Sequence, residues 1–445
     1  TNVTIPSGVT SIGEDAFGGL WALREIIVAE ENASYAAEGG VLFTKDMKTL
    51  VCYPRGKEGS AYDILGGVTT IGSAAFEDCD NLSNITMPDS VTSIGNGAFR
   101  SCSGLADITI PSNVISIGTA AFSNCDALTD IAIPNGVTDI GERAFAYCGQ
   151  LTDITIPASV TSIGAGAFSN DALLREITVA AGSDGYAAEG GVLFTKDLKT
   201  LLCYPPAGEG SAYDVPAGVT SVEESAFAVC HNLVNIAMPE GVTRIGDGAF
   251  AGCENLAGLA IPADVTSIES RTFENCKNIT DIAVPDGVTS IGYRAFNGCA
   301  NLTGIVIPAG VTRIGDSAFS GCDNLTGVDI PSGVTSIGSG AFSGCGSLVN
   351  IDIPGTVSEI GNSAFFNCGN LENVAMRDGV AIVGNWAFAF CGRLTNVAVP
   401  ATVTSIGDNA FSYGESLREI AVAEGNLSYA APDGILFAED MKTLI

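Results

Sequence analysis

The chain repeats one pattern of apolar positions every 23 residues. In each copy an Ile-x-Ile-Pro segment is followed by Val-x-x-Ile-Gly and then by Ala-Phe-x-x-Cys. A fixed period of about 20 to 50 residues is typical of stacked units, each too small to bury its own apolar face. The sequence therefore predicts a repeat solenoid, and each 23-residue copy is called a rung below. The step is clearest in two series of phenylalanines: Phe76, Phe99, Phe122, Phe145 and Phe168, then Phe227, Phe250, Phe273, Phe296, Phe319, Phe342, Phe365, Phe388 and Phe411.

The rung at 128–151 shows which elements this pattern predicts. Residues 128–134 are rich in β-branched side chains and end at Pro134, which cannot donate to a ladder, so we expect a first short strand there. Residues 137–141 predict a second short extended piece that ends at a glycine. Residues 144–148 have apolar side chains at helix-like spacing and predict one helical turn.

Stacking such rungs predicts three features shared by the whole array. A parallel sheet should run along one face, a second sheet of shorter strands along another, and a column of phenylalanine rings between them. Since neighbouring strands lie about 4.8 Å apart, fifteen phenylalanine-marked rungs should span on the order of 70 Å. We expect one elongated body over residues 1–445, and because both ends of the sequence fall inside a rung, we expect it to be a fragment of a longer protein.

Twelve of the 14 cysteines lie three residues after a repeat phenylalanine, so they should stack in register. Parallel Cβ directions hold two sulfurs poorly for the torsion of about 90° that a disulfide needs. We therefore expect buried free thiols. No Cys-x-x-Cys pair exists and the single histidine, His231, lies beside Cys230, so we expect no metal site and no cofactor.

Charge and composition narrow the classes of function. The chain has 50 acidic and 19 basic residues, a formal charge of −31, which repels nucleic acid and anionic lipid. No apolar run approaches the roughly 20 residues that cross a bilayer, so we expect no membrane insertion. A lone His231 gives no Ser-His-Asp arrangement, and pairs such as Gly246 and Gly248 are turn glycines of the repeat. We expect no enzymatic activity.

Three near-copies of one insert interrupt the array, at about 31–66, 182–217 and, truncated, 425–445. Each follows a rung that lacks the usual cysteine. Two apolar runs on either side of a Lys-Asp turn predict a β-hairpin that projects from the stack.

Aromatic and basic side chains gather in these inserts, which makes them candidate contact surfaces for a protein partner. The alternative is that Tyr35, Phe43 and Tyr53 only pack the hairpin onto the neighbouring rung. Outward positions of the main sheet are small and offer no anchor, and we expect Trp21 and Trp386 to serve in packing. The candidate contact residues are Tyr35, Phe43, Lys45, Tyr53, Tyr186, Phe194, Lys196 and Tyr204.

The order L-x-x-I-x-I-P-x-x-V-x-x-I-G-x-x-A-F-x-x-C resembles the BspA-like, or Treponema pallidum-type, leucine-rich repeats over almost the whole chain. It departs from ordinary leucine-rich repeats because proline and valine follow the strand where an asparagine ladder is usual. The resemblance implies a leucine-rich-repeat solenoid from a bacterial cell-surface or secreted protein. It also implies a protein-binding scaffold, an adhesin that contacts host matrix proteins or other cells. The alternative function is a structural spacer that displays another domain.

Overall fold

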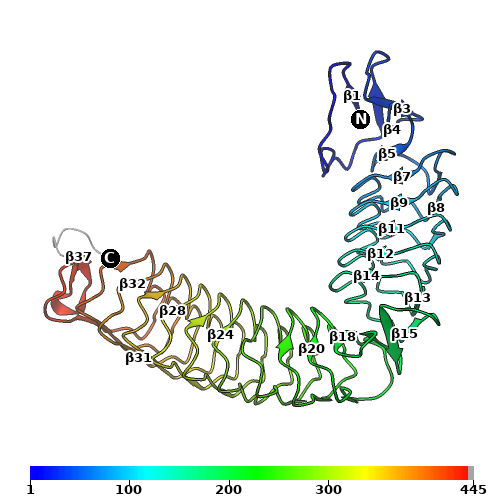
Figure 1. Cartoon of the computed structure of the whole chain (residues 1–445). Coiled ribbons are helices and arrows are strands. Elements are labelled where there is room, and N and C mark those ends of the chain that lie inside the picture. The colour runs from blue at the N-terminus through cyan, green and yellow to red at the C-terminus, as the bar shows by residue number, and fades with distance from the viewer. Residues whose placement is uncertain (439–445) are drawn as a thin grey trace. The chain divides into compact units, whose positions relative to one another are not determined.

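The computed structural model describes residues 1–438 and contains two compact units (Figure 1). Unit 1 comprises Thr1–Glu209 and Ser225–Val229, and unit 2 comprises Gly210–Glu224 and Cys230–Ile445. The prediction of one continuous body over 1–445 stays a prediction. Residues 439–445 of the truncated third insert, with Lys442 among them, lie outside the described residues.

In unit 1 the predicted sheet of shorter strands is present, but the predicted continuous sheet of longer strands is wrong, because these strands form three separate sheets and residues 128–134 form no strand. Two-residue strands pair in parallel along one side, and somewhat longer strands pair in parallel along another. The short strands are β7 (Thr70–Ile71), β9 (Ser93–Ile94), β11 (Ser116–Ile117), β12 (Asp139–Ile140) and β14 (Ser162–Ile163). The longer strands are β1 (Asn2–Ile5), β2 (Glu25–Val28), β6 (Ala61–Asp63), β8 (Asn84–Thr86), β10 (Asp107–Ile108), β13 (Asp153–Ile156) and β15 (Glu176–Val179).

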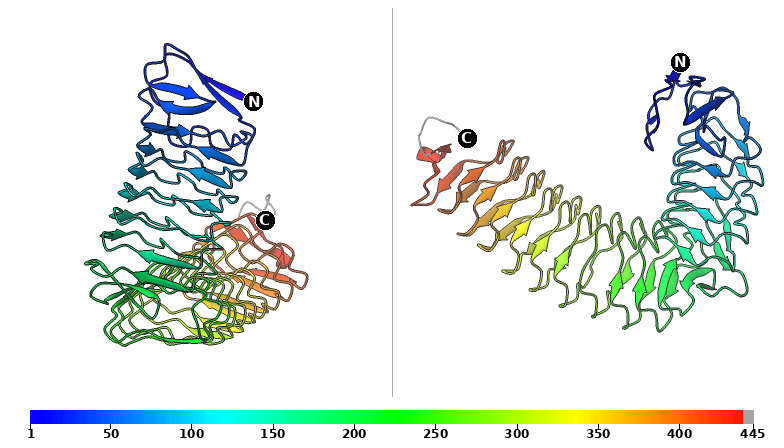
Figure 2. Two further views of the ribbon diagram at one scale, coloured as in Figure 1. Left: turned by 90° about the vertical axis from the view of Figure 1, so that its right-hand side faces the viewer. Right: turned by 45° about the horizontal axis from the view of Figure 1, so that its top comes forward.

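Unit 2 repeats the same arrangement, and its longer strands lie side by side in the second view of Figure 2. The short strands are β20 (Ser221–Val222), β22 (Arg244–Ile245), β24 (Ser290–Ile291), β26 (Arg313–Ile314), β28 (Ser336–Ile337), β30 (Glu359–Ile360), β32 (Ile382–Val383) and β34 (Ser405–Ile406). The longer strands are β19 (Ala212–Asp214), β21 (Asn235–Ala237), β23 (Gly258–Leu259), β25 (Gly304–Val306), β27 (Gly327–Asp329), β29 (Asn350–Ile353), β31 (Asn373–Met376), β33 (Asn396–Val399) and β35 (Glu419–Val422). The pair β36 (Tyr429–Ala430) and β37 (Phe437–Ala438) flanks a 3₁₀ helix, Pro432–Gly434.

The predicted phenylalanine column is confirmed in each unit. Neighbouring rings stack with centroids 5.1 to 5.8 Å apart, from Phe76 to Phe168 in unit 1 and from Phe250 to Phe411 in unit 2. Nearly all of these rings are completely buried. Because one rung has no interior of its own, each ring depends for its burial on the rings above and below it, together with the Leu, Ile and Val side chains of the same core.

The predicted helical turn is wrong, because the segment before each cysteine consists of two successive turns. Ala120 and Asn124 have φ of +52° and +60°, a left-handed conformation that interrupts any helix. The N–H of Phe122 donates to the carbonyl of Ala144 in the next rung at 2.7 Å, whereas Cys125 donates back to Phe122 at 3.2 Å. Half of the backbone N–H groups of this segment therefore donate to the next rung. In a helix these N–H groups would donate to carbonyls of the same segment instead.

The glycine that follows most of the short strands is favoured by the close approach between rungs. A Cβ on Gly118 would lie 2.6 Å from the carbonyl carbon of Gly95, one rung earlier, and a Cβ on Gly95 would lie 2.7 Å from the amide nitrogen of Ser73. No larger residue fits at this spacing without moving the backbone.

The ladder cysteines are all buried, as predicted, and no disulfide joins any cysteines of residues 1–438. Their thiols face the carbonyl of the phenylalanine one rung earlier. The Sγ–O distance is 3.0 to 3.3 Å in nine rungs, for example 3.2 Å between Cys125 and Phe99. Cysteine thus supplies a small buried donor for a carbonyl that water cannot reach. Burial raises the pKa of the Cys102 and Cys345 thiols to about 12, so they stay protonated.

The inserts do form hairpins, but they do not project from the stack. In the first insert β3 (Tyr35–Glu38), β4 (Val41–Thr44) and β5 (Thr49–Cys52) make an antiparallel meander, and β5 pairs in parallel with β7. The meander therefore extends the sheet of short strands. The second insert repeats it with β16 (Tyr186–Glu189), β17 (Val192–Thr195) and β18 (Thr200–Cys203).

The remainder of each insert adopts the structure of an ordinary rung. Tyr53 lies 23 residues before Phe76 and stacks on it at 5.3 Å, and Tyr204 stacks on Phe227 at 5.4 Å. The N–H of Tyr53 donates to the carbonyl of Ala75 at 2.7 Å, the same bond that repeat phenylalanines make. A tyrosine thus continues the phenylalanine column through the insert.

Candidate functional site

The structure buries the six aromatic residues that the sequence offered as partner contacts. For these six residues the structure supports the alternative interpretation, in which they pack the hairpin onto the neighbouring rung. Their side chains fill the meander and the phenylalanine column, out of reach of a partner. The residues concerned are Tyr35, Phe43, Tyr53, Tyr186, Phe194 and Tyr204.

Lys45 and Lys196 differ from these six because both are exposed, on the turns between the apolar strands of the two inserts. In the first turn Asp46 accepts bonds from the Thr44 hydroxyl at 2.6 Å and the Lys48 N–H at 3.0 Å. The Thr44 bond, followed by the Lys48 bond, lowers the pKa of Asp46. These bonds shape the turn, and a contact role for the two lysines stays a prediction.

Buried polar groups that the sequence did not single out hold the inserts in place. Asn32 donates through Nδ2 to the carbonyls of Pro6 and Val9, at 2.7 and 3.0 Å, and its Oδ1 accepts the N–H groups of Ser34 and Tyr35. Asn426 repeats all four bonds in the third copy. The signal was an Asn-x-Ser-Tyr run that opens both copies.

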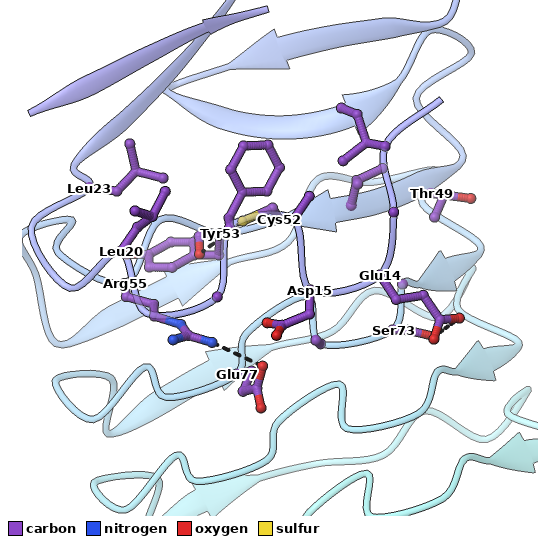
Figure 3. Close-up of a pocket in the computed structure, with 18 residues that line it drawn as sticks. Glu14, Asp15, Leu20, Leu23, Thr49, Cys52, Tyr53, Arg55, Ser73 and Glu77 are labelled. Carbon is purple, nitrogen blue, oxygen red and sulfur yellow. Dashed lines mark hydrogen bonds and ion pairs between the residues drawn. The ribbon is translucent and has the colours of Figure 1, made fainter. Parts of the chain in front are cut away.

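A small cavity lies beside the first insert, between the first rung and the rung of Phe76 (Figure 3). Its volume is about 200 Å³. The Arg55 guanidinium reaches Glu77 at 2.9 Å and Asp78 at 2.8 Å, Arg100 also pairs with Glu77, and Arg55 lies over the ring of Trp21. These charges neutralise one another, and the cavity is smaller than the roughly 300 Å³ of an ordinary ligand pocket. The cavity is therefore a weaker candidate for a binding site than the outer sheet face of unit 2.

A broad hollow lies on the outer face of the longer strands of unit 2, over β25, β27, β29 and β31. Its volume is about 870 Å³. Gly304 and Gly327 form its floor, since neither carries a side chain and a Cβ on either would meet nothing within 4 Å. Val306 stands beside them with 78% of its surface exposed. The surface predicted to be small and without anchors thus has a hollow and one exposed apolar side chain.

The rim of this hollow is acidic. Asp281, Asp329 and Asp352 line it together with Asn350 and Asn373. Asp352 pairs with Arg377, and the Asn373 amide donates to Asn350 at 2.6 Å. Asp281 and Asp329 make no salt bridge within residues 1–438, so their charge faces solvent. The hollow can therefore attract a cationic group.

Over residues 1–438 no three His, Cys, Asp or Glu side chains are grouped so that they could hold a metal ion. In the same residues no helix combines the length and apolar character needed to cross a membrane.

Comparison with known proteins shows which family this architecture matches. The chain matches the BspA type leucine rich repeat region, in six copies, over residues 1–38, 63–184, 211–326 and 312–430. No curated protein sequence matches it.

Solved bacterial structures resemble the chain over most of its length. A leucine-rich repeat protein from Eubacterium ventriosum is 30% identical, with a TM-score of 0.60, over 69% of this chain and 82% of its own. A leucine rich cell surface protein from Faecalibacterium prausnitzii is 32% identical, with a TM-score of 0.53, over 84% of this chain and 79% of its own. The pneumococcal vaccine antigen PcpA, at 23% identity and a TM-score of 0.51 over 70% of this chain and 93% of its own, shares the fold.

Proteins built from leucine-rich repeats typically serve as scaffolds for protein interaction, a role that suits a rigid array with a broad outer sheet face. The repeat, the two parallel sheets and the family match agree over residues in both units. The chain belongs to the BspA-type leucine-rich repeat family.

Proposed function

We propose that this chain is a protein-binding scaffold at a bacterial cell surface or in secreted form, an adhesin that contacts host matrix proteins or proteins of other cells. The observation that carries the proposal is the acidic hollow over β25–β31, with Gly304 and Gly327 as its floor. The likeness to a cell surface protein of Faecalibacterium prausnitzii supports the location.

The hollow has the size of a protein contact. It crosses four neighbouring strands, which at about 4.8 Å per strand is wide enough for an extended segment or a loop of a partner. Val306, which lines the hollow, supplies an exposed apolar anchor, and the carboxylates of Asp281 and Asp329 form the polar rim. Such a rim selects partners with basic residues and speeds their association at low salt.

The test fills the hollow and neutralises its charge in one step. Lysines at Gly304 and Gly327 meet no clash, because nothing lies within 4 Å of a Cβ at either position and neither glycine has a positive φ. The matched control is the G149K/G369K double variant, which makes the same change in net charge at two glycines that are equally unobstructed but lie outside the hollow.

Binding is measured to immobilised host matrix proteins and to bacterial surface extracts. We expect G304K/G327K to lower affinity at least tenfold and G149K/G369K to leave it unchanged, with the wild-type affinity falling as salt is raised. Equal binding by both double variants would assign the contact to another surface. A complete lack of partners for the wild type would favour the structural spacer.

A further inference from the structure

Three aromatic residues of unit 2 occupy backbone positions that disfavour them. Trp386, Phe390 and Tyr413 have φ of +59°, +60° and +59°. A left-handed conformation costs an L-residue about 1–2 kcal/mol, and it is a clear outlier for a bulky side chain. The conformation belongs to the turn itself, since the position of Trp386 is left-handed in other rungs as well, whether it holds Gly340, Ser363 or Arg294.

These three side chains gather on the turn side of two adjoining rungs. The Phe390 and Tyr413 rings stack with centroids 4.4 Å apart and planes within 9° of parallel. Trp386 is parallel to Tyr413 within 10°, at 6.2 Å. Phe366 packs edge-on against Phe390 from the rung before, at 5.2 Å. Trp386, which the sequence assigned to packing, thus belongs to a group of rings, and the residues Phe366, Trp386, Phe390 and Tyr413 are called the aromatic cluster below.

The aromatic cluster is accessible to solvent. Tyr413 is 62% exposed and Phe390 is 39% exposed, whereas Trp386 and Phe366 are half-buried. Glycine and asparagine fit this turn conformation with less strain, and Gly340, Gly344 and Asn367 occupy the equivalent positions in other rungs. What distinguishes these rungs is therefore the stacked, solvent-exposed aromatic rings, and exposed apolar and aromatic groups are typical of contact surfaces.

Three asparagines lie in the same turns as the rings, beside the exposed Asp408. Asn367 and Asn409 occupy the positions of Phe390 and Trp386 in the rungs before and after, and Asn385 directly precedes Trp386. All three asparagines are exposed. The Oδ1 of Asn409 accepts the Ser412 hydroxyl at 3.0 Å. Amide donors and acceptors therefore lie around an apolar, ring-shaped platform.

The size of the platform argues against a protein partner. An aromatic side chain buries about 150–250 Å² in full, so three partly exposed rings offer no more than about 300 Å². A stable protein interface needs about 800 Å² from each partner. A ligand of one or two sugar rings fits the available area.

We propose that the aromatic cluster binds a neutral saccharide, with the C–H face of a pyranose against the outer ring face and the asparagine amides bonded to its hydroxyls. This site is on the turn side of the rungs and is independent of the protein-binding hollow on the sheet. It gives the scaffold a second kind of contact.

The two tryptophans of the chain make a direct test possible. In a W21F background Trp386 is the sole tryptophan, so its emission reports on the cluster. The protein is screened on an array of neutral and sialylated oligosaccharides and then titrated with cellohexaose, maltohexaose and an N-acetylglucosamine hexamer. We expect a neutral glycan to bind and to shift the Trp386 emission.

Variants separate binding from folding. Phe390→Asn and Tyr413→Asn place a tolerated residue at each left-handed position, so both should keep or raise the melting temperature while they lower glycan affinity at least tenfold. Tyr147→Asn is the matched control, since Tyr147 is an exposed tyrosine in the same turn position of unit 1, with φ of +63°. No bound glycan, binding only to sialylated glycans, or affinity unchanged in F390N and Y413N would each overturn the proposal.

Discussion

The first and second inserts have nearly the same sequence and the same strands, but different chemistry closes them onto the stack. In the first, Arg55 and Glu77 are 10% and 6% exposed and form a buried ion network. In the second, Pro206 and Ala228 occupy the equivalent positions.

The rungs before the two inserts differ in the same way. Phe17 is only half-buried and Leu20 is exposed beside the cavity, whereas Phe168 and Asp171 are almost completely buried. One insert design therefore tolerates either a charged, open junction or an apolar, closed one. The residues that the two inserts share must therefore specify the fold of the insert. The residues that differ at the two junctions determine how the stability of each copy depends on charge and pH.

Removing the tyrosine that both inserts share should cause the largest loss of stability, and this loss should be equal in the two copies. Tyr53→Ala and Tyr204→Ala each delete a ring from the buried column, which we expect to cost about 3–5 kcal/mol of local stability. Hydrogen exchange of the adjoining strands measures the loss. A large effect in one insert and none in the other would mean that the copies do not share a core.

Glu77→Gln should destabilise the first insert alone, by about 3 kcal/mol, because it leaves the buried Arg55 with only Asp78 as an ionic partner. The control is Glu142→Gln, whose pairing with Arg143 is half exposed on both sides and should contribute under about 1 kcal/mol. Thermal melts compare the two variants. Equal, small shifts would show that the network contributes nothing to closure.

Asn32→Ala should cost about 2 kcal/mol, since it removes four bonds of a buried side chain. At the equivalent position of the second insert, Ser183 accepts the Tyr186 N–H at 3.2 Å, so Ser183→Ala should cost about 1 kcal/mol. Denaturant unfolding gives both values. The account of how the inserts are held is wrong if Ser183→Ala is the more damaging change.

Asp171 should make the second junction sensitive to pH. Burial raises the pKa of this carboxyl well above its usual range, even though the Cys148 N–H donates to Oδ1 at 2.7 Å, and Oδ2 has no partner. The folded state therefore holds its proton more tightly than the unfolded state, so this contribution to stability is present at low pH and is lost as pH rises above about 4.

Asp171→Asn keeps the Oδ1 acceptor without the charge. It should raise stability at pH 7 by about 1 kcal/mol or more and flatten the dependence on pH. Melting temperatures between pH 4 and 8 test this. An unchanged pH profile would show that Asp171 does not control the second junction.

The sequence predicts the rung well because its period is long, regular and tied to burial. Phe122, Cys125 and their equivalents lie where the 23-residue step places them. The helical turn failed because spacing alone does not reveal a left-handed residue such as Ala120, and propensity gives no reason to expect one. The backbone hydrogen bonds between rungs, which the sequence does not show, explain why the segment before each cysteine forms two successive turns.

The inserts were misplaced for a different reason. Composition marked Tyr53 and Tyr204 as exposed contacts, since tyrosine is common at interfaces, but their 23-residue distance from Phe76 and Phe227 was the better signal. The hollow at Gly304 and the cluster at Trp386 could not be foreseen, because each arises from residues that only stacking brings together.

The central claim is that the inserts belong to the stack, and native-state hydrogen exchange tests it most directly. Mass spectrometry of peptides covering 41–53 and 192–204 is compared with a peptide covering 93–99 from an ordinary rung. We predict protection of the insert amides as strong as that of the rung, because β4, β5, β17 and β18 are buried and paired. Exchange within seconds in both inserts, with the rung still protected, would contradict the account.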